Sequence, residues 1–141
     1  TLETLVLQDK VPVLGICVGM QILSSSSDEG RLPGLGWVPG RVRSFSKNAL
    51  SARLPSPHMG WNDVRPKLGS PLFAGFASDA RFYFLHSYYL ECDEPSHVAA
   101  VATYGFDFSC SVTAGNVHGV QFHPEKSHHF GLKLLKNFAE L

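Results

Sequence analysis

The clearest candidate for a chemical role is a cysteine at a sharp turn. Cys17 lies in Gly15-Ile16-Cys17-Val18-Gly19, directly after an apolar run. The flanking glycines relieve crowding at a strained strand-to-helix turn, and the positive end of the following helix lowers a thiol pKa. We therefore predict that Cys17 attacks as a thiolate, while the amide N–H of Val18 donates to the oxygen of a tetrahedral intermediate. A small buried cysteine without chemistry is the alternative.

A histidine and a glutamate near the C-terminus provide the partners that such a nucleophile needs. A cysteine requires a base, and the base requires an orienting group on its other ring nitrogen. Strand alternation points His123 away from the apolar Phe122, and Pro124 then turns the chain so that the Glu125 carboxylate returns to the imidazole. We predict that His123 is the base and Glu125 its orienting partner; a bland structural role at a strand end is the alternative.

The other histidines raise the question of a metal site. They are His58, His86, His97, His118, His128 and His129. No histidine or cysteine pairs stand at the spacings of a zinc site, so we predict no metal. We expect no other cofactor. Cys92 and Cys110 lack flanking glycines and a helix start, and we predict that they are inert.

Alternating strand and helix signals indicate an α/β fold. A nearly all-apolar run at residues 11–16 is typical of a strand buried on both faces, and a helical pattern starts at residue 20. Residues 28–71 are rich in Gly and Pro and predict loops and hairpins. An amphipathic helix is expected over residues 129–141. Further strands are expected at residues 37–42, 62–65, 81–90, 97–103, 108–113 and 117–122.

Size and composition narrow the class of protein. The chain has 141 residues and no net charge, which fits one domain, residues 1–141, with a sizeable core. Its cations form no basic stripe, so we expect no nucleic-acid partner. The apolar runs are too short for a bilayer, and residues 1–10 do not resemble a secretory signal. An odd number of cysteines, three, argues against a disulfide framework and favours a cytoplasmic location.

Two motifs together resemble the paired signature of the class I glutamine amidotransferases. They are residues 14–21, LGICVGMQ, and residues 121–127, QFHPEKS. The stretches at residues 34–40, 57–62, 82–89 and 131–138 resemble, within that family, the glutaminase subunits of imidazole glycerol phosphate synthase. The resemblance covers essentially the whole chain. It implies a flavodoxin-like mixed sheet flanked by helices.

The resemblance also implies an activity and a partner. The chain would hydrolyse glutamine to glutamate through a thioester on Cys17, and ammonia would pass to a (β/α)8-barrel cyclase subunit in histidine biosynthesis. Contacts to glutamine would come from Gln21, Glu29, Ser87 and Tyr88. Residues facing the cyclase would be Met59, Gly60, Trp61 and Lys126. For each of these the alternative is an ordinary surface, strand or core role.

One departure from the family lies at the front of the chain. The family begins with additional βα units, about 60 residues by the usual size of a βαβ unit, and these supply a second oxyanion donor. We expect weak catalysis without it, and an unpaired sheet edge that self-associates or is completed by another chain. A non-catalytic fragment with a structural or binding role is the alternative function. A related hydrolase acting on γ-glutamyl substrates is a third.

Overall fold

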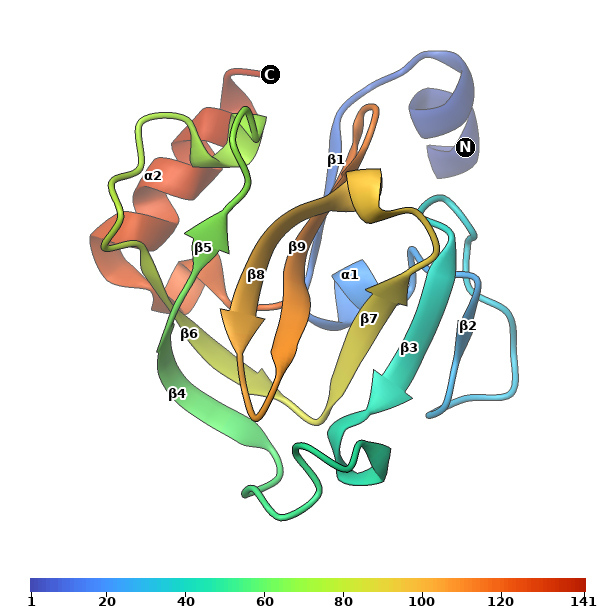
Figure 1. The fold of residues 1–141 in the computed structure, drawn as a ribbon. Coiled ribbons are helices and arrows are strands. Elements are labelled where there is room, and N and C mark those ends of the chain that lie inside the picture. The colour runs from blue at the N-terminus through green and yellow to red at the C-terminus, as the bar shows by residue number, and fades with distance from the viewer.

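An eight-stranded mixed sheet forms the centre of the molecule in the computed structural model, which describes residues 1–141 (Figure 1). The strand order is β1-β10-β9-β7-β3-β2, and β8 pairs with both β9 and β5. The pairs β1–β10 and β2–β3 are parallel, and the other pairs are antiparallel. The strands are β1 (Val13–Ile16), β2 (Ser26–Ser27), β3 (Gly40–Ser44), β5 (Arg65–Pro66), β7 (Tyr88–Cys92), β8 (Val98–Thr103), β9 (Asp107–Ala114) and β10 (Val117–Val120).

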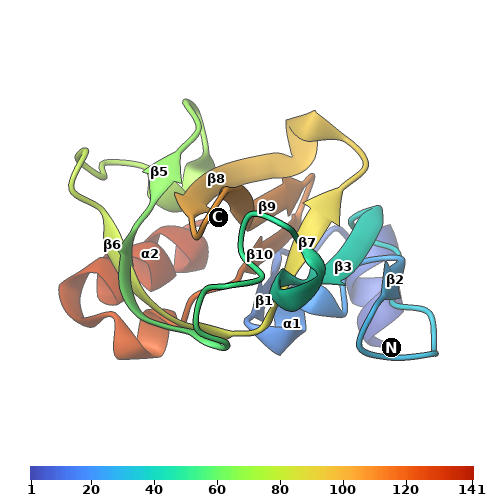
Figure 2. The same cartoon turned by 60° about the horizontal axis from the view of Figure 1, so that its bottom comes forward.

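A separate two-stranded ribbon and two α-helices complete the framework. The ribbon pairs β4 (His58–Asp63) with β6 (Arg81–His86) in antiparallel register. Helix α1 (Val18–Gln21) packs on β1 and β10, and α2 (His128–Ala139) lies beside β6 (Figures 1 and 2). None of the helices has the length and apolar character to cross a membrane. Single helical turns occur at η1 (Thr4–Gln8), η2 (Phe45–Lys47), η3 (Pro71–Phe73), η4 (Pro95–His97) and η5 (Pro124–Lys126).

Two buried clusters lie on opposite faces of the sheet. Consecutive strand residues point to opposite faces, and Tyr89 and Leu90 of β7 belong to different clusters. The larger cluster is rich in phenylalanine and includes Leu134 of α2, whereas the smaller includes Met20 of α1. Each helix therefore covers one face. This arrangement confirms the predicted α/β class, a mixed sheet flanked by helices.

Strand β1 lies at the edge of the sheet. It pairs with β10 on one side, and no strand pairs with its other side. The preceding segment folds back beside it, with Val6 buried in the smaller cluster. The side-chain amide of Asn116, in the turn between β9 and β10, donates to the carbonyls of Val6 and Val11 at 2.8 and 2.9 Å. One side chain thus anchors the N-terminal segment to the sheet.

Several predicted elements differ in extent from the observed ones. The aromatic stretch at residues 81–90 is two strands, because the chain leaves β6 at His86 and enters β7 at Tyr88 in a different sheet. The strand predicted at residues 62–65 is instead the end of β4 and the start of β5. Long β-like sequence fits one strand or two equally well. Tertiary pairing decides where it breaks.

Candidate active site

Cys17 occupies a strained turn between β1 and α1. Its amide still donates to the carbonyl of Val120 at 2.8 Å, so the parallel ladder runs one residue past β1. The backbone then adopts φ 53° and ψ −110°, which is costly for a residue with a Cβ. A Cβ on Gly15 would lie 2.4 Å from the carbonyl oxygen of Gly19, whereas a Cβ on Gly19 would meet nothing. The prediction that both glycines relieve crowding therefore holds only for Gly15.

The Cys17 thiol is half-buried and hydrogen-bonded from two sides. It donates to the carbonyl of Leu85 at 3.8 Å, and Nε2 of Gln121 donates to it at 3.7 Å. Burial raises the thiol pKa above its usual 9.0, and the Glu125 charge adds to this, while the Val18 amide, Gln121 and Lys126 act in the opposite direction. The predicted lowering of this pKa is wrong. Desolvation outweighs the lowering effects of the Val18 amide, Gln121 and Lys126.

His123 and Glu125 form a short hydrogen-bonded contact on the turn that follows β10. Nδ1 of His123 lies 2.6 Å from Oε1 of Glu125, and the two side chains are 17% and 50% exposed. The turn is fixed to β6, because the His123 amide donates to the Tyr83 carbonyl at 2.9 Å. Ser127 Oγ donates to the His123 carbonyl at 2.6 Å and accepts from the Tyr83 amide at 3.0 Å. These bonds hold the backbone of His123 between β6 and α2.

Helix α2 approaches the same turn at unusually close range. A Cβ on Gly131 would lie 1.7 Å from the carbonyl oxygen of Pro124. Only glycine allows this contact, so the first turn of α2 supports η5 directly. Helix packing on one face of the sheet therefore sets the position of Glu125.

Cys17 and His123 follow strands that end at the same edge of the sheet. Strands β1 and β10 are parallel, with Ile16 opposite Val120, so the residues that follow them emerge together. Glu125 is near enough for its charge to raise the Cys17 pKa. No hydrogen bond joins the Cys17 thiol to the His123 ring. The structure thus gathers the three predicted groups at one edge, with the thiol bonded to Leu85 and Gln121.

A shallow pocket of about 280 Å³ opens beside the nucleophile turn. Val18, Gln21 and Glu29, three of the predicted site residues, line it. Gln21 Nε2 donates to the carbonyl of Tyr88 at 3.4 Å, which brings Tyr88 next to this pocket. Ser87 is not among the lining residues; its hydroxyl accepts from Ser56 at 3.3 Å.

The residues predicted to face a partner lie on the β4–β6 ribbon and the adjoining turn. Met59 and Trp61 are 64% and 42% exposed, which excludes a core role for Trp61. The Trp61 ring stacks on His128 with a centroid distance of 5.7 Å. Lys126 Nζ lies 6.0 Å from the ring centroid of Tyr83. Gly60, between Met59 and Trp61 in β4, has a φ of 120°.

The other two cysteines lie in surroundings that disfavour reaction. Burial raises the pKa of Cys92 to about 11 and raises that of the fully buried Cys110 as well. A thiol so hard to ionise is a poor nucleophile at neutral pH.

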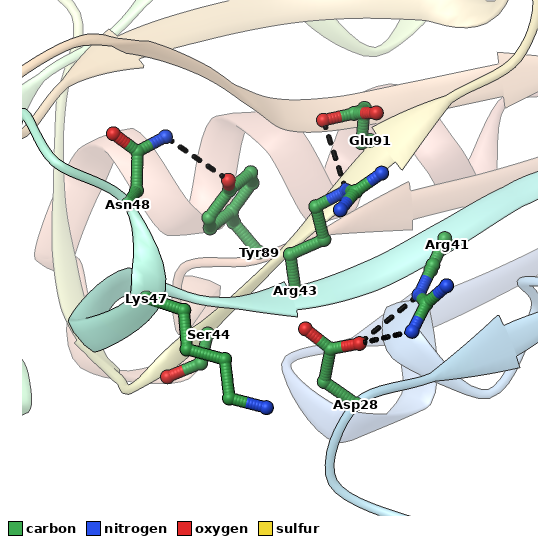
Figure 3. A pocket seen from close by; sticks show the side chains of 8 residues that line it. All are labelled: Asp28, Arg41, Arg43, Ser44, Lys47, Asn48, Tyr89 and Glu91. Atoms are coloured by element: carbon green, nitrogen blue, oxygen red, sulfur yellow. Dashed lines mark hydrogen bonds and ion pairs between the residues drawn. The ribbon is translucent and has the colours of Figure 1, made fainter.

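A second pocket, of about 390 Å³, lies on β3 and β7 and contains none of the predicted catalytic residues (Figure 3). Most of its charged side chains form ion pairs with one another. Arg41 donates twice to Asp28, at 2.7 and 3.0 Å, and the Arg41 guanidinium lowers the Asp28 pKa. Arg43 lies 3.2 Å from Glu91 across the same surface. We assign this surface a structural role in joining neighbouring strands.

The sequence analysis missed several residues that surround the thiol and imidazole. Gln121 and Ser127 stand within the recognised motifs, but no pattern signalled that their buried side chains contact the thiol and the His123 carbonyl. His58 and His86 were weighed only as metal ligands. The structure pairs them with each other, with 2.9 Å between Nδ1 of His58 and Nε2 of His86. A search for polar residues inside strands rich in apolar and aromatic residues would have found His58 and His86, which lie in β4 and β6.

The fold and the site residues agree with one family of enzymes. The family model for glutamine amidotransferase class-I matches residues 2–141, and the chain belongs to this family.

Individual relatives come from one group of enzymes. Subunit HisH of imidazole glycerol phosphate synthase from Bdellovibrio bacteriovorus is 64% identical over 140 residues, covering 99% of this chain and 69% of that protein. The subunit of the same name from Leptospira borgpetersenii is 50% identical over 140 residues, with the same two coverages.

Solved structures share the fold at low sequence identity. A glutamine amidotransferase from Thermotoga maritima aligns with a TM-score of 0.61 at 19% identity, covering 96% of this chain and 50% of that one. Another glutamine amidotransferase gives a TM-score of 0.67 at 18% identity, covering 98% of this chain and 66% of that one. The chain therefore spans one half to two thirds of the length of these solved structures.

Proposed function

We propose that this chain is the glutaminase subunit of an imidazole glycerol phosphate synthase, which releases ammonia from glutamine for histidine biosynthesis. The proposal rests on one observation. Cys17 and the His123–Glu125 pair follow the ends of two adjacent parallel strands, β1 and β10. The 64% identity to a HisH subunit over nearly the whole chain supports the substrate and the pathway.

The first half of the reaction forms a thioester. Burial keeps the Cys17 pKa above its ordinary value, so the thiol needs a base, and His123 is the histidine at the same sheet edge. The sulfur attacks the side-chain carbonyl carbon of glutamine, and the backbone N–H of Val18 stabilises the developing oxyanion. The C–N bond then breaks, and ammonia leaves with the proton that His123 returns.

The second half regenerates the thiol. Water attacks the thioester while His123 accepts its proton, and cleavage of the C–S bond yields glutamate and protonated Cys17. Glu125 holds the Nδ1 proton of His123, so that Nε2 is the nitrogen available for proton transfer. Gln21 and Glu29 line the pocket beside Val18 and would bind the amino-acid end of glutamine, and the Tyr88 carbonyl accepts a hydrogen bond from Gln21.

Ammonia would be delivered to a (β/α)8-barrel cyclase subunit. We infer that it binds the exposed side of β4, at Met59, Gly60 and Trp61, together with Lys126. Trp61 and Lys126 both neighbour the Tyr83 ring. Methionine and aromatic side chains are enriched at protein interfaces.

Covalent labelling combined with ammonia release tests this function. A glutamine analogue that alkylates thiols is expected to give one adduct per chain, on Cys17, and none in Cys17→Ser. Cys92 provides the matched control, because Cys92→Ser should label normally. Ammonia release is then measured with and without the cyclase. No adduct under either condition would favour a structural or binding role over catalysis.

The unpaired side of β1 leads to a second, separate proposal about assembly. Its backbone N–H and C=O groups on that side face no strand, and such edges promote association. We infer that this edge pairs with a second copy of the chain or with another segment. Light scattering at high protein concentration tests the first option, and a monodisperse monomer would exclude it.

A further inference from the structure

Two histidines outside the predicted triad contact each other in the interior. His58 of β4 is the register partner of His86 in β6, and their ring nitrogens lie 2.9 Å apart. The residues are only 5% and 6% exposed. The His58 ring stacks on Phe84 and on Tyr104, with centroid distances of 4.9 and 4.1 Å. An aromatic enclosure with no carboxylate partner distinguishes this pair from His123.

The proton positions of this pair follow from its neighbours. Nδ1 of His86 lies 2.7 Å from the carbonyl of Tyr88, which only accepts, so Nδ1 carries the proton and Nε2 accepts. Nδ1 of His58 must then donate to His86, and its Nε2 accepts from the side-chain amide of Asn62 at 3.3 Å. Burial lowers the pKa of His58 to about 4 and that of His86 to about 3. Both rings are therefore neutral at physiological pH.

The same hydrogen-bond chain continues to the sulfur. The Tyr88 carbonyl also accepts from Gln21 Nε2 at 3.4 Å, and that amide donates to Gln121 Oε1 at 3.1 Å. With its oxygen occupied in this way, the buried Gln121 directs its NH₂ group at the sulfur of Cys17, at 3.7 Å. If the amide were turned over, an oxygen lone pair would face the sulfur. The order of donors therefore decides whether a thiolate is stabilised or repelled.

We propose that His58 and His86 are positioning residues for Cys17, which act through the Tyr88 carbonyl and the two glutamine amides to hold an N–H donor on the sulfur. The inference rests on the proposed function only in taking Cys17 as the nucleophile. Strand β6 supports it from a second direction, because the thiol donates to Leu85, the residue that precedes His86.

The rate of Cys17 alkylation by iodoacetamide, followed against pH, measures the effect on the thiolate directly. His86→Phe keeps a planar ring but removes both nitrogens, and should shift the profile upward by about one pH unit, the equivalent of one hydrogen bond to a charge. His86→Asn retains a donor near the position of Nδ1 and should recover part of the shift. The matched control is His118→Phe, which removes an equally buried histidine bonded only to Thr113 and should leave the profile unchanged.

A double-mutant cycle separates positioning from a merely structural role. Gln121→Leu removes the donor on the sulfur, so adding His86→Phe to it should cause no further shift. An unchanged profile in His86→Phe, or a full additional shift in the Gln121→Leu background, would overturn the proposal. Alkylation requires no glutamine turnover, so the result is independent of whether the chain is a glutaminase.

Nitrogen NMR of the unaltered chain provides a second test, which does not depend on the folding of a variant. Both His58 and His86 should carry their proton on Nδ1 at about neutral pH. Finding either ring protonated on Nε2 would break the donor order and refute the proposal.

Discussion

The His123–Glu125 pair and the His58–His86 pair differ in the partners of their imidazole rings and in their burial. His123 has a carboxylate 2.6 Å from its Nδ1 and keeps part of its ring in contact with solvent. His86 has another imidazole and a carbonyl as partners, inside an aromatic enclosure. Burial lowers the pKa of His58 to about 4 and that of His86 to about 3, so this pair stays neutral near neutral pH.

This contrast shows that the residue type alone does not assign a role. An imidazole with a carboxylate partner is stabilised as a cation and suits a general base. An imidazole whose desolvation holds its pKa at about 3 is a neutral spacer with one donor and one acceptor. The first kind of site moves protons, and the second holds hydrogen-bond direction.

The largest expected effect is that of His123→Gln. Loss of the base should reduce glutamine hydrolysis by about 10⁶-fold, as for removal of the histidine from a serine-protease triad, with a small change in melting temperature. Steady-state ammonia release and thermal melting measure the two quantities. An activity loss no greater than that of His86→Phe would mean that His123 is not the base.

The buried pair should dominate the pH dependence of stability. The folded-state pKa values of His58 and His86 are below the unfolded value of 6.5, so the unfolded chain binds more protons as pH falls from about 6.5 toward 4. Stability should fall across that window by up to about 1.4 kcal/mol per pH unit for each histidine. Burial also lowers the His118 pKa, which adds an effect of the same sign.

Thermal melts at several pH values test this prediction. The double variant His58→Phe/His86→Phe should have a flatter dependence between about pH 6.5 and 4. Asp28 and Asp107, whose pKa values are lowered from 3.8 by hydrogen bonds to Arg41 and Thr103, lose their contribution only at lower pH. An unchanged slope in the double variant would show that the pair does not control acid unfolding.

Glu125→Gln should have an intermediate effect. The amide keeps the size of the side chain but removes the charge that favours the imidazolium, and a loss of about 10⁴-fold in kcat is expected. The same change should lower the Cys17 pKa slightly, because the Glu125 charge raises it. Alkylation against pH measures the second quantity, and a shift to higher pH would contradict it.

The smallest expected effect is that of Ser127→Ala. This change breaks the link between the His123 carbonyl and the Tyr83 amide, and leaves a buried amide without its partner. Stability should fall by about 1–3 kcal/mol, with a loss in kcat of less than about tenfold. Denaturant unfolding measures the first, and Ser96→Ala, a change in the surface turn η4, provides a control.

Much of the fold could be predicted because its signals are local. The apolar run before Cys17 and the helical spacing near the C-terminus each correspond to an observed element, and the aromatic residues 81–90 correspond to two, β6 and β7. The predicted fold class and family are confirmed. The roles of Cys17, His123 and Glu125 stay predictions, although the sheet brings all three to one edge.

The amino-acid sequence by itself determined the turn that exposes Cys17, because the glycine that precedes it and the helix start that follows it act within a few residues. It also determined the pairing of His123 with Glu125, which are two positions apart. Only the tertiary structure decided the thiol pKa and the partners of Gln121, His58 and His86. Those depend on desolvation and on contacts across 28 to 104 residues, which no local pattern records.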